Sequence, residues 1–179
     1  GIGDLYIGDS YVFSNGRYIP SPHFGGLGES GYVVLGNHFI LVGEGAISET
    51  EFMEGNTRTG NYGRKRDREL FKDFAKKLYG VEEVYLMPRY DGFGHIDLFI
   101  GGIPEANILS VSRDYHKKNR RIFGEIKERF DPCIIVTEEE EFENNYRVVY
   151  NKGGELFVIT DKDAPHLRAE LRDKSLNVV

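Results

Sequence analysis

Hydrophobic and polar residues follow one another along this chain in an order that recurs. Residues 31–44 (GYVVLGNHFILVGE) form two short β-rich runs around Gly-Asn, a pattern typical of a hairpin. Residues 65–79 then place apolar side chains at helical spacing between charged ones, and Gly80 is suited to end a helix. Residues 81–88 (VEEVYLMP) predict a strand. The pattern therefore predicts one unit of strand, strand, helix and strand.

The same order of elements recurs twice. The second unit has predicted strands at 95–103 and 106–112, a helix at 115–130 and a strand at 132–137. The third has strands at 146–150 and 155–160, a short helix at 165–172 and a last strand at 176–179. Residues 4–20 resemble the hairpin of a further unit. We therefore predict an α/β fold, a tandem array of ββαβ units of roughly 50 to 65 residues. An ordinary layered α/β domain with coincidentally similar units is the alternative.

Length and composition agree with a folded domain. The 179 residues are 40% hydrophobic and 13% aromatic, which is enough to bury a substantial core. Residues 1–179 are therefore predicted to form a single domain. Its units have approximate bounds at 1–25 (partial), 26–89, 90–140 and 141–179.

Charge and cysteine content narrow the range of partners. A net charge of −6 argues against a generic phosphate-binding surface, so no nucleic-acid partner is expected. No run of about 18 apolar residues predicts a membrane span, and no signal-peptide pattern is present. Cys133, the single cysteine, cannot form an internal disulfide. These features predict a cytoplasmic protein with no membrane partner and leave a homo-oligomer open.

Residues 95–100 (HIDLFI) set two polar side chains inside an apolar run. In a strand, His95 and Asp97 would point to one face, and Ile96 and Leu98 would point to the other. A buried imidazole and a buried carboxylate must be compensated, because an unpaired buried charge is unfavourable. The pair is either an acid–base site beside a cavity or a satisfied histidine next to a surface aspartate.

Three further polar residues lie in glycine-containing or apolar settings. They are Asp9 in LYIGDSYVF, Glu29 in FGGLGESGYVV and Arg58 in EGNTRTGNYG. Each lies next to glycine or at a predicted strand edge, where loops often carry functional residues. Turn chemistry is the alternative role for each of them.

No metal centre is predicted. The chain has no HxxxH or CxxC spacing that would hold zinc, and its five histidines are scattered: His23, His38, His95, His116 and His166. Cys133 opens a predicted strand of apolar β-branched residues and is expected to be a small buried hydrophobe rather than a nucleophile.

In their order along the chain, these stretches resemble the guanidino-group-modifying enzymes, the pentein superfamily. The superfamily includes arginine deiminase, agmatine deiminase, dimethylargininase and the amidinotransferases. Its fold is a propeller of five ββαβ-type units around a pseudo-fivefold axis. The resemblance therefore implies a partial α/β-propeller here, with about three whole units plus a leading hairpin.

The resemblance also implies site residues. LYIGDSYVFSNG is similar to the family stretch that supplies a guanidinium-binding aspartate, which implies that role for Asp9. GESGYVVLG resembles EGGDVLVLG and implies Glu29 as a second carboxylate. NTRTGNYG implies Arg58 as a ligand of the substrate carboxylate, and GHID matches the family's His-x-Asp pair at His95 and Asp97.

The chemistry of the family suits these residues. A guanidinium is planar and cationic with several N–H donors, so carboxylates are its natural ligands. In the family, a cysteine thiolate attacks the guanidinium carbon, the histidine protonates the departing ammonia or amine, and water hydrolyses the covalent intermediate. The resemblance implies that His95 moves the proton while Asp9, Glu29 and Asp97 orient the substrate. It implies no cofactor.

The family's cysteine lies near the C-terminus in a glycine-rich His-Cys context, after the last unit. The resemblance implies that this chain lacks both that segment and the first unit, and that it is inactive by itself. Three functions stay open for a small guanidino partner such as arginine or a derivative. They are an arginine-deiminase-like hydrolase acting on the C–N bond of a linear amidine, a non-catalytic ligand-binding or interaction module, and an amidinotransferase.

Overall fold

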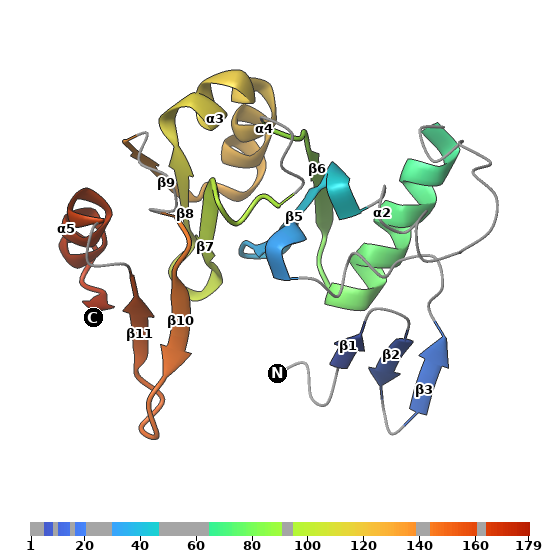
Figure 1. Ribbon diagram of the computed structural model, residues 1–179, viewed down its shortest axis with the longest axis horizontal. Helices are drawn as coiled ribbons and strands as arrows, with labels where there is room; N and C mark the ends of the chain where they lie inside the picture. Colours follow the sequence, from blue (N-terminus) through green and yellow to red (C-terminus); the bar gives the residue numbers. More distant parts are fainter. Residues whose placement is uncertain are drawn as a thin grey trace. The chain divides into compact units, whose positions relative to one another are not determined.

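In the computed structural model, the described residues are 6–8, 11–14, 17–20, 30–46, 65–90, 95–138, 144–160 and 164–179. Their strands form four three-stranded sheets (Figure 1). The chain divides into two compact units, the first made of residues 1–33 and 39–96 and the second of residues 34–38 and 97–179.

The first sheet is antiparallel and lies in the first compact unit. Its strands are β1 (Tyr6–Gly8), β2 (Tyr11–Ser14) and β3 (Arg17–Pro20), with β2 in the middle. Aromatic and β-branched residues in all three runs favour strands. The sequence predicted a hairpin here, and that prediction was one strand short.

The second sheet belongs to the first complete ββαβ repeat. Its elements are β4 (Val33–Leu35), β5 (Phe39–Gly43), the helix α2 (Lys65–Tyr79) and β6 (Glu83–Met87). The sheet order is β4-β5-β6, and β5 and β6 are parallel. Parallel neighbours need a crossover connection, and this one contains α2. The helix has the predicted bounds, and Gly80 follows it with φ of 65°, the left-handed conformation that ends many helices.

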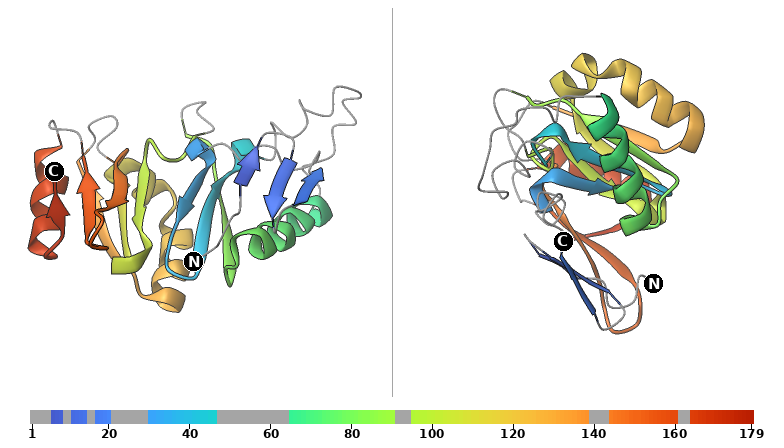
Figure 2. Two further views of the ribbon diagram at one scale, coloured as in Figure 1. Left: turned by 90° about the horizontal axis from the view of Figure 1, so that it is seen from below. Right: turned by 90° about the vertical axis from the view of Figure 1, so that its right-hand side faces the viewer.

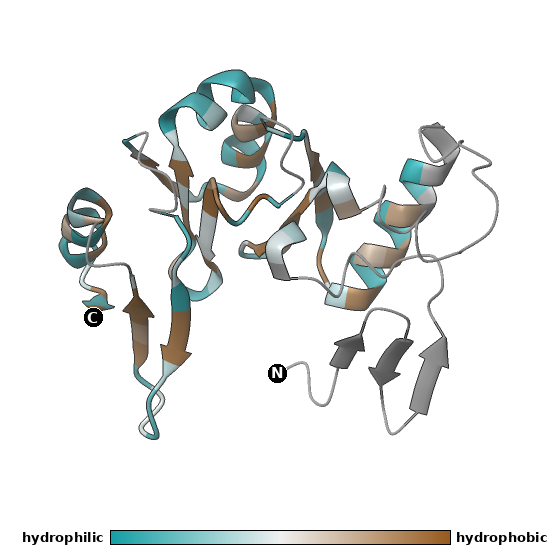
Figure 3. Cartoon of the chain, viewed as in Figure 1, coloured by the Kyte–Doolittle hydropathy of each residue, from teal (hydrophilic) through white to brown (hydrophobic). Residues whose placement is uncertain are grey.

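The apolar face of α2 is buried against this sheet. Phe71 and Ala75 of the helix pack in one core with Ile40, Val42 and Val84 of β5 and β6. Figure 3 shows hydrophobic and hydrophilic residues alternating along the helix, as expected where one face is buried and the other is polar. This core fixes the sheet that follows the short 3-10 helix η2 (Ser30–Tyr32).

In the second repeat, β7 is antiparallel to β8 and β8 is parallel to β9. Its elements are β7 (Ile100–Ile103), the 3-10 helix η3 (Pro104–Ala106), β8 (Ile108–Ser112), α3 (Arg113–Lys118), α4 (Arg120–Phe130) and β9 (Cys133–Thr137).

The helix predicted at 115–130 is interrupted. Asn119 lies between α3 and α4 with φ of −113° and ψ of 24°, and its side-chain amide donates a hydrogen bond to the Tyr115 carbonyl oxygen at 3.0 Å. Asparagine side chains compete in this way with the backbone hydrogen bonds of a helix. The prediction of a single helix was therefore wrong at this residue.

The third repeat contains β10 (Arg147–Tyr150), β11 (Leu156–Ile159), α5 (Pro165–Asp173) and β12 (Asn177–Val178). Here too the first two strands are antiparallel and the last is parallel to its neighbour. All three complete repeats thus have the order strand, strand, helix, strand. The predicted α/β class and its ββαβ repeats are confirmed.

The second and third repeats share one hydrophobic core. Ile103, Ile108 and Ile135 of the sheet β7-β8-β9 pack in the same cluster as Leu167 and Leu171 of α5. Figure 2 shows α5 beside the strands of its own repeat. The helix of the third repeat therefore helps to bury the sheet of the second.

Two glycines allow close approach to both faces of β7. A Cβ atom on Gly101 would lie closer than 3.0 Å to the ring of Tyr146, and one on Gly102 would meet the Leu35 carbonyl oxygen. Successive residues of a strand point to opposite faces, so β7 is contacted from both sides. Tyr146 is buried, which raises the pKa of its hydroxyl, and Ser110 Oγ donates to that hydroxyl at 3.4 Å.

We expect Gly101→Ala to lower the free energy of unfolding by about 1–3 kcal/mol, because the added methyl group must displace the Tyr146 ring. Urea denaturation measures the change. Gly124→Ala is the matched control, because a Cβ at this helical glycine meets nothing within 4 Å. The control should stabilise the protein by up to about 1 kcal/mol. An unchanged midpoint for Gly101→Ala would contradict the packing of Tyr146 on β7.

Candidate functional site

Of the five predicted site residues, His95 and Asp97 lie in the described part of the chain. Asp9, Glu29 and Arg58 lie outside the described residues, so their predicted roles stay predictions.

His95 and Asp97 do not lie in a strand. Residues 95–99 form a bend and a turn, and β7 begins only at Ile100, so the predicted strand start was wrong. The physical reason is that the backbone of this segment has another partner: the Ile96 N–H donates to the Gly31 carbonyl oxygen at 2.7 Å. Strand alternation therefore does not fix the directions of the two side chains.

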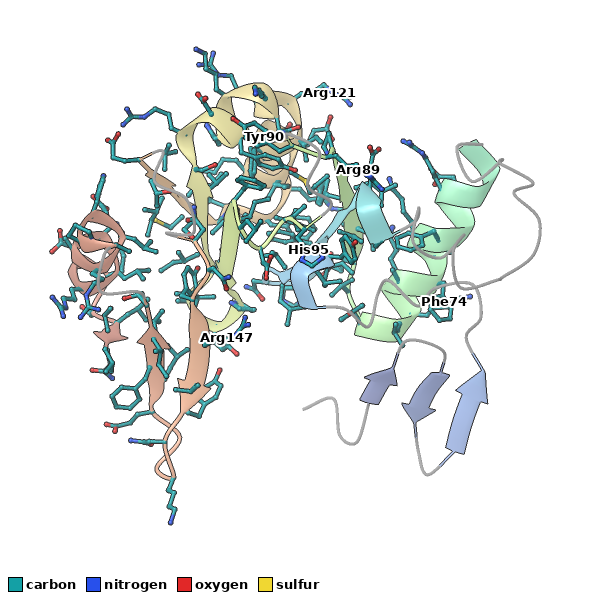
Figure 4. The ribbon with its side chains drawn as sticks, viewed as in Figure 1. Phe74, Arg89, Tyr90, His95, Arg121 and Arg147 are labelled. Carbon is teal, nitrogen blue, oxygen red and sulfur yellow. The ribbon has the colours of Figure 1, made fainter. Side chains whose placement is uncertain are left out.

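The imidazole of His95 lies against the 3-10 helix η2 (Figure 4). A Cβ on Gly31 would lie 2.7 Å from the Cγ atom of His95 and 2.8 Å from its Cε1 atom, and closer still to Nδ1. The ring of Tyr32 meets the imidazole edge to face, with 4.6 Å between ring centroids and 65° between ring planes. The absence of a side chain at Gly31 thus makes the space that the imidazole occupies.

Asp97 follows two residues later, at the start of the turn at residues 97–99. Its side chain is half-buried, and its Oδ1 atom is shielded from solvent. Charges interact more strongly where water is excluded. A shielded carboxylate oxygen is therefore suited to accept a hydrogen bond from a cationic N–H group.

Gly31 and Tyr32 are the contacts that sequence reasoning missed. Both lie in the stretch GESGYVVLG, which was singled out for Glu29 alone. The signal was the glycine two positions after Glu29, but a sequence does not show which distant side chain fills the space beside a glycine. The structure brings this stretch to His95.

Within the residues that the structure describes, no three His, Cys, Asp or Glu side chains gather as a metal ion would require. No helix in the same residues is long and apolar enough to cross a membrane. Cys133 is half-buried on β9 and packs against the shared core of the second and third repeats, as expected for a small hydrophobe.

Comparison with solved structures identifies the fold. The chain is similar to a histidine-to-glycine variant of dimethylarginine dimethylaminohydrolase, solved as its adduct with S-methyl-L-thiocitrulline, with a TM-score of 0.53 and 17% identity over 84% of this chain and 47% of that one. It is also similar to C. jejuni agmatine deiminase, with a TM-score of 0.53 and 13% identity over 84% of this chain and 49% of that one.

The chain thus spans about half the length of these two enzymes. No protein-family model matches it, and no curated protein does. The pentein-type fold that the sequence motifs implied is confirmed.

The contact between residue 31 and His95 can be measured by a double-mutant cycle. We expect Gly31→Ala to lower the free energy of unfolding by about 1–3 kcal/mol, because the new methyl group would overlap the imidazole. In a His95→Ala background the same change should cost less than about 1 kcal/mol, since the overlapping ring is gone. Chemical denaturation of the four proteins gives the coupling. Equal losses in both backgrounds would contradict the contact.

Proposed function

We propose that the protein containing this chain is a guanidino-modifying hydrolase of the arginine-deiminase kind, acting on the C–N bond of arginine or a related compound. One observation carries the proposal: the imidazole of His95 rests on Gly31 and Tyr32. That turn directly follows Glu29, which the family resemblance assigns as a carboxylate ligand. The stretch GESGYVVLG and the stretch GHID were assigned to this chemistry separately, and Gly31 of the first lies against His95 of the second.

The fold supports the same class of substrate. The names of the two similar enzymes specify dimethylarginine and agmatine, and both compounds carry a guanidino group. A cationic, planar group of this kind calls for several carboxylate acceptors. Asp9, Glu29 and Asp97 are the carboxylates that we assign to it, and Arg58 is assigned to the carboxylate of an amino-acid substrate.

The proposed reaction replaces one C–N bond of the guanidinium by a C–O bond from water. The products are a ureido compound and ammonia or an amine. His95 donates a proton to the departing nitrogen and then accepts one from the attacking water. Asp97 accepts N–H hydrogen bonds from the guanidinium and so holds the guanidinium carbon within reach of the attacking group.

Family members use a thiolate to form a covalent intermediate before water attacks. Cys133 is not assigned this role, because its side chain packs against the core of the second and third repeats. The thiol assigned by the resemblance belongs to a glycine-rich His-Cys segment, and no stretch of this sequence matches that segment.

The proposal is tested by offering the full-length protein arginine, agmatine and methylated arginines, and measuring ammonia or amine release and ureido product. We expect turnover of at least one of them. His95→Gln should lower kcat by about 100-fold or more with little effect on the unfolding midpoint. His166→Gln is the control, because it removes a histidine that lies on helix α5 and has no assigned role.

The same assay separates the alternatives. Binding of a guanidino compound without turnover would favour a ligand-binding module. Product that forms only when an amine acceptor is added would identify an amidinotransferase. Neither binding nor turnover with any of these compounds would refute a guanidino-modifying function.

A further inference from the structure

We propose that Tyr32 is a positioning residue for His95, and that it and Gly31 hold the imidazole so that Nε2 is the nitrogen that transfers the proton. The proposal rests on the acid–base role of His95 proposed above. It adds a residue to which the family resemblance gives no role.

Tyr32 is suited to this role because it is itself held rigidly. Only 2% of the residue is exposed, and it belongs to the core that Ile40, Val42, Phe71 and Val84 build between α2 and its sheet. Side chains in a close-packed core sit in rotamer minima and interdigitate with their neighbours. Its ring therefore offers the imidazole a fixed surface rather than a mobile neighbour.

The ring of Tyr32 fixes the tilt of the imidazole. Edge-to-face contact is a preferred geometry for aromatic pairs, because the positive edge of one ring meets the negative face of the other. The centroid distance of 4.6 Å and the interplanar angle of 65° fall in this class. Rotation of the imidazole about its own bond to Cβ would lose this contact.

Gly31 determines which edge of the imidazole faces the turn. The atoms nearest to the missing Cβ of Gly31 are Nδ1, Cγ and Cε1 of His95. The Nδ1 edge therefore lies against η2, and Nε2 lies on the far side of the ring. The Ile96 N–H bond to the Gly31 carbonyl oxygen fixes the backbone beside the histidine at 2.7 Å. The ring of His95 and the backbone of the next residue, Ile96, thus both contact Gly31 of η2.

The experiment compares three variants of the full-length protein. Tyr32→Phe keeps the ring, Tyr32→Leu removes it, and Phe71→Leu makes the same kind of deletion in the same core at a residue with no place in the site. We expect Tyr32→Leu to lower kcat by about 10- to 100-fold with KM changed less than about threefold, because a misplaced acid–base group affects the reaction more than binding. Tyr32→Phe and Phe71→Leu should keep kcat within about threefold of wild type.

A second readout does not need turnover. The ¹⁵N resonances of the His95 imidazole report its environment and tautomer, and they should change in Tyr32→Leu but not in Phe71→Leu. Loss of activity in Phe71→Leu equal to that in Tyr32→Leu would reduce the effect to core stability and overturn the proposal. Unchanged kcat and unchanged resonances in Tyr32→Leu would overturn it as well.

The two proposals fail in distinguishable ways. If wild type turns over no guanidino compound, the proposed function fails, and the His95 resonances still decide whether Tyr32 holds the ring. If wild type is active and Tyr32→Leu is equally active, only the positioning role fails. Loss of activity in Tyr32→Phe would place the effect on the hydroxyl group and overturn the role given to the ring.

Discussion

A sheet of three short strands has two faces, and one helix can cover only one of them. A repeat of this kind can bury its second face against a neighbouring repeat, as repeat proteins generally do. The second and third repeats show how: Ile108 and Ile135 of one sheet pack with Leu167 and Leu171 of the next repeat's helix. The glycines of β7 follow from the same need, because neighbouring segments approach that strand on both faces.

Local pattern was sufficient for the repeat architecture but not for its irregularities. The helix at Lys65–Tyr79 was predicted to the residue, because an apolar stripe and a terminal glycine are both local signals. The break at Asn119 depends on a hydrogen bond from its side chain to Tyr115, which periodicity does not reveal. The extra N-terminal strand was missed because the run was assigned to a hairpin of two strands.

For the candidate site, sequence supplied the residues and structure supplied the contact. His95 and Asp97 were selected by type and spacing, yet the strand on which that spacing argument depended begins only at Ile100. The Ile96 N–H bonds to Gly31, a residue far away in the sequence, and no local pattern encodes that choice. The position of the His95 imidazole is set by its packing against Gly31, which has no side chain, and not by the alternation of side chains along a strand.

The helix α5 also affects how the protein opens. Its leucines are part of a core that contains residues of the preceding sheet, so the helix cannot leave without exposing that sheet to water. We therefore expect the backbone amides of β8 and β11 to exchange their hydrogens through one shared opening, as members of a single cooperative unit. The second and third repeats would then unfold together, although they are separate in the sequence.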